Sequence, residues 1–173
     1  MHPINSYDYI YLLYVFIYIL NIMRKSQWGP IVWNVLHCIV FKIKPENFAS
    51  EKSKILEIIS GICQNLPCPD CAAHSSSFIR TYPKNTMNTK EGLVKMVFIL
   101  HNTVNKRIKK NIYNINGLSI YHNKNFKDVL IEYYIMMKQS YYSERMILNN
   151  FHRNAFIKIF YEYFSNNRSK FVV

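Results

Sequence analysis

The sequence predicts an all-α fold, and three observations carry that prediction. Glycine and proline are scarce, with 4 and 6 in 173 residues, so few turns interrupt the chain. Strict alternation of apolar and polar residues, which is typical of half-buried strands, is rare. Apolar residues recur at helical spacing over long stretches instead. Half of the residues are apolar, which is enough for one packed domain with extensions.

The first segment, residues 1–25, is predicted to be an apolar helix. Residues 7–23 are almost wholly apolar or aromatic, and Arg24 and Lys25 follow at once. As a helix they would span roughly 25 Å, slightly less than the hydrocarbon thickness of a bilayer. We expect either a short membrane anchor, with Arg24 and Lys25 keeping the next domain on the cytoplasmic side, or an amphipathic helix docked on protein. A signal peptide is least favoured, because a basic leader and a cleavage site are missing.

Residues 26–110 are predicted to form a core of four helices with recognisable ends. The four are expected to run from residue 26 or 27 to about 43, from 48 to 62, from 67–69 to about 82, and from 88 or 89 to 108. Pro30 suits a first helical turn, and Ser50 is available to cap the second helix. Four helices of this length can enclose a hydrophobic core and a cofactor slot.

Residues 111–173 are predicted to be a helical extension, with helices near 126–139 and 142–165, and a candidate partner surface. His122 and His152 stand alone there, without a ligand constellation. The formal charge of the chain is +12, and residues 106–173 hold 12 Lys and Arg against 4 Asp and Glu. The positive residues are interleaved with Asn, Ile, Tyr and Phe, as a biased genome would produce. With no helix-turn-helix, finger or RNA-recognition signature, we expect no specific nucleic-acid binding.

Chemistry is concentrated at Cys68 and Cys71, in Pro-Cys-Pro-Asp-Cys. Pro69 in the first turn of a helix would place Cys68 at the positive end, where a thiolate is stabilised. Cys71, three residues on, would lie on the same face. Two sulfurs so placed can close a small, reversible disulfide, as thiol exchange requires. The spacing favours a redox-active pair.

Zinc binding is the competing interpretation of the cysteines. Cys63, Cys68, Cys71 and His74 could surround a metal ion, and the chain would then be a non-enzymatic zinc module with a basic, nucleic-acid-binding tail. Ligands crowded onto one helix make this geometry cramped, so we expect no metal. Cys38 is read as a small buried hydrophobe, and Cys63 as a buried helix-end residue rather than a resolving thiol.

Two further constellations favour the redox interpretation. Trp33 and His37 lie four residues apart, as do His101 and Asn105, with Asn102 beside His101 and a basic segment at 106–110. Together they offer an aromatic wall, two imidazoles, amide groups and cations for phosphates. These are the parts of a flavin dinucleotide pocket.

Three motifs in order then carry a resemblance to a known family. They are Gly29-x3-Trp33-x3-His37, the Cys68/Cys71 motif followed by His74, and residues 101–107, His-Asn-Thr-Val-Asn-Lys-Arg. The chain resembles the Erv/ALR-type FAD-linked sulfhydryl oxidases over about residues 27–110, and is most similar to members encoded by large DNA viruses.

The resemblance implies an FAD-dependent thiol oxidase that forms disulfides in protein substrates and passes electrons through FAD to oxygen, giving hydrogen peroxide. Cys68 would exchange with the substrate dithiol, and Cys71 would face the flavin. It also implies a homodimer, and we expect a place in the host cytoplasm or the virion. The residues implied to bind the cofactor are Gly29, Trp33, His37, Phe41, His74, His101, Asn102, Asn105 and Lys110.

The chain also departs from the family pattern. Phe41 or Lys42 stands where the family has an aromatic residue, usually tyrosine, and Lys109 replaces a glycine. A second C-x-x-C is missing, so electrons are expected to come directly from a substrate protein or from a separate thiol carrier.

Overall fold

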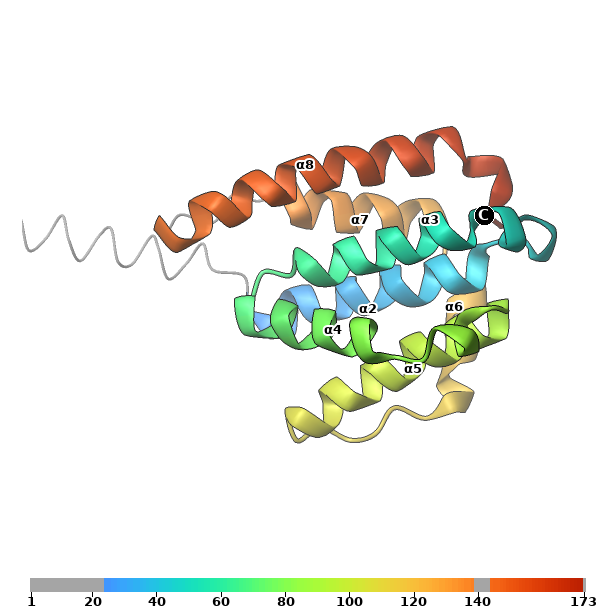
Figure 1. Cartoon of the computed structure of the whole chain (residues 1–173), viewed down its shortest axis with the longest axis horizontal. Helices are drawn as coiled ribbons and strands as arrows, with labels where there is room; N and C mark the ends of the chain where they lie inside the picture. Colours follow the sequence, from blue (N-terminus) through green and yellow to red (C-terminus); the bar gives the residue numbers. More distant parts are fainter. Residues whose placement is uncertain (1–23, 139–143, 173) are drawn as a thin grey trace, which may run out of the picture.

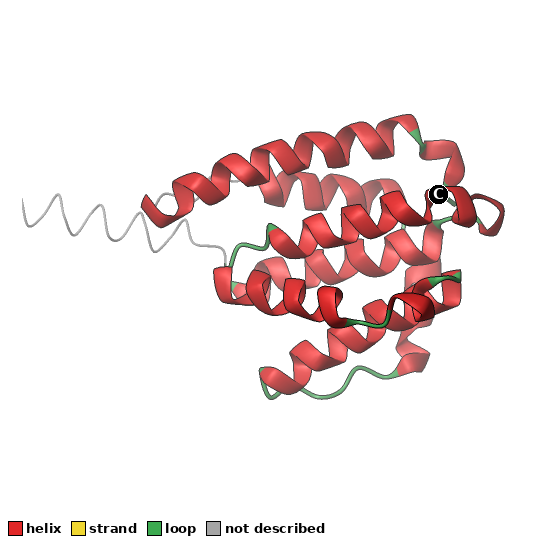
Figure 2. Ribbon diagram, in the orientation of Figure 1, coloured by secondary structure: helices red, strands yellow, loops and turns green. Residues whose placement is uncertain are grey.

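The computed structural model describes residues 24–138 and 144–172, with side chains of the last long helix described from Phe151 onward. This part of the chain is built of helices and short 3-10 turns, with a single isolated β-bridge and no strand (Figures 1 and 2). The predicted all-α class is confirmed. The predicted apolar helix at residues 7–23 lies outside the described residues, and none of the described helices is long and apolar enough to cross a membrane.

The four predicted core helices are present. They are α2 (Lys25–Lys42), α3 (Pro45–Gln64), α4 (Pro69–Thr81) and α5 (Lys90–Arg107), with the 3-10 turn η1 (Lys84–Met87) before α5. Thr89 caps α5, because its Oγ1 accepts the Gly92 N–H at 3.0 Å. The predicted cap at Ser50 is wrong. Helix α3 already begins at Pro45, whose fixed φ suits a first helical turn, so Ser50 lies inside the helix and its hydroxyl donates to the Asn47 carbonyl.

Helix α2 lies at the centre of the molecule. It packs against α3 and α5 of the core and against α6 (Ile120–Asn123) and α7 (Phe126–Lys138) of the extension. Six consecutive residues, 35–40, are buried, so this helix is covered on every side rather than along one stripe. Each buried aliphatic side chain here contributes roughly 1.5–3 kcal/mol of hydrophobic stabilisation.

The extension forms helices near both predicted ranges. After η2 (Ile115–Ser119) and α6, helix α7 packs on α2, and α8 (Glu144–Asn166) packs on α7 and ends before η3 (Arg168–Lys170). In Figure 1, α7 and α8 lie on the side of α2 and α3 that faces away from α5. The sequence did not predict η2 and α6, because elements this short show no periodicity. Buried residues of the core and of the extension belong to one hydrophobic cluster.

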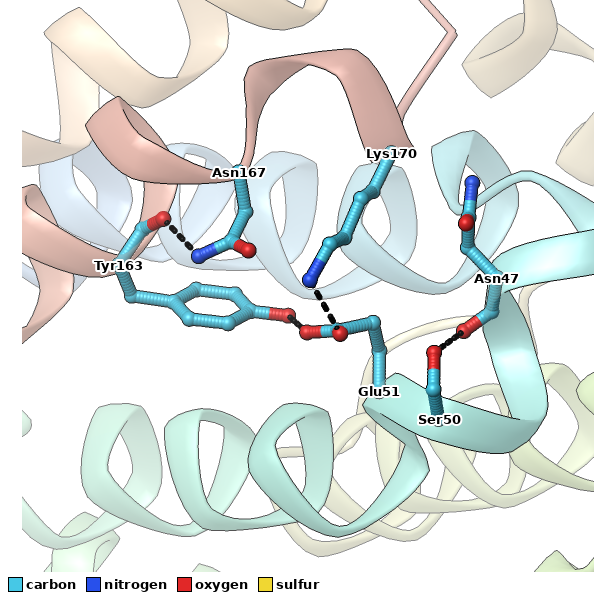
Figure 3. A network of polar contacts seen from close by, with 6 residues as sticks. All are labelled: Asn47, Ser50, Glu51, Tyr163, Asn167 and Lys170. Atoms are coloured by element: carbon cyan, nitrogen blue, oxygen red, sulfur yellow. Dashed lines mark hydrogen bonds and ion pairs between the residues drawn. The ribbon is translucent and has the colours of Figure 1, made fainter.

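A polar clasp fastens the last described residues to α3, as Figure 3 shows. The Lys170 ammonium lies 2.6 Å from Glu51 Oε1, and the Tyr163 hydroxyl donates to Glu51 Oε2 at 2.9 Å. These bonds to a buried carboxylate hold its pKa below the usual range, the Lys170 contact contributing most. Beside the clasp, Phe171 pairs with Ile43 in the isolated bridge. The end of α8 is therefore fixed against the start of α3.

Candidate active site

The two cysteines of the C-x-x-C motif form a disulfide at the start of α4. Their Cα atoms are 5.1 Å apart. Cys68 is the N-cap residue and Pro69 occupies the first turn, as the sequence predicts. The Cys71 backbone N–H donates to Cys68 Sγ at 3.3 Å, and both cysteines are half-buried. Helix N-terminal N–H groups stabilise a thiolate, so the local structure favours Cys68 as a thiolate once the disulfide is reduced.

An aromatic cluster joins the two histidine motifs. His37 Nε2 and His101 Nδ1 are 3.0 Å apart, which brings α2 and α5 into direct contact. The Trp33 indole stacks on His101 with ring centroids 3.9 Å apart and planes 10° apart. Tyr113 also stacks on His101, at 4.9 Å, and Tyr121 stacks on His37, at 4.4 Å. Two imidazoles and three aromatic rings therefore meet in one place.

Burial keeps both histidines of this cluster neutral. It lowers the pKa of His37 to about 3, with a further contribution from His101, and it lowers the pKa of His101 to about 4, with a further contribution from Lys110. At neutral pH one ring therefore donates its N–H to the other.

Two buried nitrogens on helices of the core, one on α2 and one on α4, have no hydrogen-bond partner among the described residues. They are Nδ1 of His37 and Nε2 of His74. Buried polar groups are nearly always hydrogen-bonded in native proteins, so these atoms can take a hydrogen bond from a ligand or from an ordered water. A Cβ at Gly29, on the same helix as Trp33, would meet no atom within 4 Å, which leaves space beside the backbone. The pKa of His74 is lowered by burial and then by Arg107.

Aromatic surfaces, unpartnered nitrogens and cations match the chemistry of a flavin dinucleotide. The rings can cover a planar heterocycle, and Arg107 and Lys110 supply charge for phosphates. The residues present therefore fit FAD.

Comparisons with known proteins agree with this chemistry. The Erv1 / Alr family model matches residues 30–127, more than half of the chain. The chain belongs to the Erv1/Alr family. An FAD-linked sulfhydryl oxidase of African swine fever virus is 33% identical over 86 residues, which cover 50% of this chain and 71% of the relative. The yeast (Saccharomyces cerevisiae) FAD-linked sulfhydryl oxidase ERV2 is 27% identical over 89 residues, covering 51% of this chain and 45% of the relative.

A plant relative extends the comparison. The Arabidopsis thaliana FAD-linked sulfhydryl oxidase ERV1 is 24% identical over 91 residues, which cover 53% of this chain and 47% of the relative. No solved structure matches the chain significantly. The Erv1/Alr match includes α6 but stops at the beginning of α7, so most of α7 and all of α8 lie beyond it.

Some residues that the Erv1/Alr resemblance implies for the cofactor site make hydrogen bonds to the protein backbone. The Asn102 side chain bonds the backbone of Tyr113 twice, accepting its N–H at 2.7 Å and donating to its carbonyl at 3.1 Å. Asn102 therefore holds Tyr113 in place. Asn105 is buried one turn after His101, and its carbonyl accepts the N–H of the exposed Lys110 at 2.9 Å.

Phe41 and Lys42, the two sequence alternatives for the aromatic position after His37, both contact His122. Phe41 packs edge-on against His122, and buried Lys42 donates to the His122 carbonyl at 2.7 Å. The ring stacked on His37 comes from Tyr121 on α6 instead. The sequence did not indicate that Tyr113 and Tyr121 stack on the histidines, because both lie in the segment assigned to the extension.

The other two cysteines are buried free thiols, as predicted. Burial raises the pKa of Cys38 to about 11 and that of Cys63 to about 12. Within the described residues, no group of three or more His, Cys, Asp and Glu side chains is placed to hold a metal ion.

Proposed function

We propose that this chain is an FAD-linked thiol oxidase that forms disulfide bonds in protein substrates and passes the electrons to oxygen, giving hydrogen peroxide. One observation carries the proposal. A C-x-x-C disulfide caps a helix in the same four-helix core as an aromatic histidine cluster with an unpartnered buried nitrogen. Membership of the Erv1/Alr family and relatives named FAD-linked sulfhydryl oxidase support it.

The bonds and electrons of the disulfide exchange can be followed through the two cysteines of this chain. A substrate thiolate attacks Cys68 Sγ, the Cys68–Cys71 bond breaks, and Cys71 leaves as a thiolate. The second substrate thiolate then attacks the mixed disulfide and Cys68 leaves. The substrate gains a disulfide, and the enzyme pair takes up the two electrons as thiols. Bound FAD supplies a two-electron acceptor that returns the pair to the disulfide.

The places of the two cysteines in α4 support an order of action for them. Cys68 precedes the helix, and the Cys71 N–H that donates to its sulfur stabilises the thiolate released in the second exchange step. We assign Cys68 to substrate exchange and Cys71 to the flavin side.

The proposed cofactor contacts divide by chemistry. Trp33, His37 and His101 supply ring surfaces and nitrogen hydrogen bonds, with Tyr113 and Tyr121 completing the aromatic wall. Asn105 and His74 supply further polar groups. Gly29 leaves room for close approach, and Lys110 supplies charge for the phosphates. Phe41 and Asn102 would act by supporting Tyr121 and Tyr113.

The proposed partners are reduced proteins, or a separate thiol carrier, together with oxygen. We further propose that the enzyme acts in the host cytoplasm or the virion, with residues 7–23 as a candidate membrane contact. The packing of α7 limits where the proposed homodimer contact can lie. The surface of α2 that α7 covers is not available to a second copy, so the dimer contact must lie elsewhere.

A visible absorption spectrum tests the function most directly. Purified protein should be yellow, and it should consume oxygen when given dithiothreitol. Substituting Cys68→Ser should remove oxygen consumption and leave the yellow colour. A colourless protein with stoichiometric zinc would contradict the proposal.

A further inference from the structure

A groove of about 750 Å³ lies beside the redox pair and has no role in the function proposed so far. One wall is the end of α3 and the start of α4, where Leu66, Pro69 and Ala72 line it. Pro69 stands between the two cysteines in the sequence, and Ala72 directly follows Cys71. The groove therefore runs alongside the loop that carries the disulfide.

The opposite wall belongs to α8, which lies beyond the Erv1/Alr match. Ala155, Phe156 and Ile159 contribute the apolar part of this wall, and all three have described side chains. In Figure 1 the first half of α8 extends over the same end of the molecule at which α3 ends and α4 begins. The extension thus completes a concave surface that the helical core alone does not enclose.

The close approach of α8 to α3 depends on Gly61. A Cβ at this position would overlap the ring of Phe156, so only glycine lets the aromatic side chain sit directly on the helix backbone. Arg153 fixes the same part of α8 to α7, because its Nη2 donates to the Met137 carbonyl at 2.9 Å. The clasp of Glu51, Tyr163 and Lys170 fixes the other end. The α8 wall is therefore held in position at three places.

The lining of the groove suits a polypeptide better than a small thiol. Phe156, Ile159 and Leu66 offer apolar contacts, and Gln64 and Asn65 offer amide groups. Ile159 is 44% exposed, so its side chain is available for an apolar contact with a partner. Mixed apolar and amide linings accommodate the side chains and backbone of an extended peptide.

We propose that this groove docks the reduced polypeptide substrate, with an apolar residue next to a substrate cysteine resting on Phe156 and Ile159 while that cysteine reaches Cys68. The proposal rests on the proposed thiol oxidase function and deepens it, since the extension then selects the substrate. The chemistry is the exchange already balanced above, in which the enzyme disulfide is the oxidant.

The test compares two arginine substitutions on neighbouring positions of α8. Ala155 is exposed and lines the groove, whereas Asn154 is exposed and does not line it. Adjacent helical residues point about 100° apart, so Ala155→Arg fills the groove and Asn154→Arg adds the same charge outside it. Arginine is a good helix former, so both variants should fold, which circular dichroism checks.

Two substrates are oxidised by each flavin-loaded variant, dithiothreitol and a reduced synthetic peptide, Leu-Cys-Gly-Gly-Cys-Leu. The ratio of kcat/KM for the peptide to kcat/KM for dithiothreitol should fall about tenfold in Ala155→Arg and stay within about twofold in Asn154→Arg. The Kd of the peptide with both cysteines changed to serine should rise in parallel. Ile159→Arg is a second groove variant.

An unchanged ratio and Kd in both groove variants would overturn the docking proposal, as would an equal fall of the ratio in Asn154→Arg. The two proposals fail separately. Wild-type protein that oxidises neither substrate would refute the oxidase function, whereas normal oxidation with no groove effect would refute only the docking site.

Discussion

The helical core and the extension differ in the kinds of side chain that they bury. In the core, burial includes polar groups: His37 and His101 are buried at the centre of the molecule, and nitrogens of His37 and His74 have no partner among the described residues. The interior of the extension is largely aromatic, with Phe160 in contact with both Tyr133 and Phe164, and among its described side chains the buried Tyr133 hydroxyl has no partner. Burying polar groups lowers the stability of the core but provides hydrogen-bonding groups for a ligand. Apolar packing in the extension raises the stability of the fold and offsets this loss.

The largest expected effect is in Cys71→Ser, which should lose activity with little change in stability. It should lower oxygen consumption with dithiothreitol by at least about a thousandfold, because Cys68 then has no enzyme disulfide bond for the thiolate of dithiothreitol to attack. Half-buried Cys71 is small, so the thermal midpoint should change little. Cys38→Ser is the control, and activity retained in Cys71→Ser would contradict the assignment of the pair.

The opposite result is expected for Phe160→Ala in the extension. Phe160 is 2% exposed and packs on Tyr133 and Phe164, so its truncation should cost about 3–5 kcal/mol of unfolding free energy. Urea denaturation measures this. Tyr161→Ala, on the neighbouring exposed position, should cost less than about 1 kcal/mol. An equal loss in both variants would show that α8 is not packed as described.

His101→Ala tests the cofactor pocket without touching the cysteines. Loss of its stacking on Trp33 and its contact with His37 should weaken flavin binding about a hundredfold, read from the flavin released on dilution. The Cys68–Cys71 disulfide should still be reduced by dithiothreitol. His122→Ala, at an exposed histidine, should keep the flavin. Full flavin content in His101→Ala would place the cofactor elsewhere.

As the pH falls, the buried histidines of the core and the clasp that holds the extension should lose their stabilising effect at different pH values. The pKa values of His37 and His101 are about 3 and about 4 in the fold and near 6.5 when unfolded, so the unfolded chain binds more protons below about pH 6.5. Unfolding free energy should fall by about 2 kcal/mol or more between about pH 7 and about pH 5. Urea titrations of His101→Ala should show a smaller fall.

The clasp on α3 should lose its stabilising effect at a lower pH than the histidines, because the pKa of Glu51 is lowered in the fold from 4.5. Its stabilisation is present above that value and is lost as the pH falls through the folded pKa. Glu51→Gln should therefore be less stable than the parent at neutral pH, and the difference should shrink in acid. A constant difference would mean that the carboxylate charge contributes nothing.

The smallest effect is expected at Lys109, which has a φ of 56°, in the left-handed region. This backbone conformation explains why glycine suits the position. Lys109→Gly should raise the unfolding free energy by about 0.5–1 kcal/mol, because a Cβ costs energy there. Lys106→Gly, in the last turn of α5, should lower it by a similar amount. Thermal unfolding of both variants decides the sign.

Much of the fold could be predicted because its signals are local. Pro69, Thr89 and the spacing of apolar residues locate three helix starts or ends to within a few residues. The start of α3 was misplaced because Pro45 ends one segment and begins another. Tyr113 and Tyr121 escaped prediction because their stacking on the histidines arises only when short turns after α5 fold back onto α2. Such contacts leave no periodicity in the sequence.

The burial of Cys38 and Cys63 has a consequence for the lifetime of the enzyme. The proposed reaction releases hydrogen peroxide within the same molecule, and peroxide attacks thiolates to give sulfenic and then irreversible sulfinic acids. With pKa values of about 11 and about 12, these two thiols stay protonated and screened from solvent. Repeated turnover therefore exposes only the cysteine pair that each cycle restores to the disulfide, and the interior resists damage by the product.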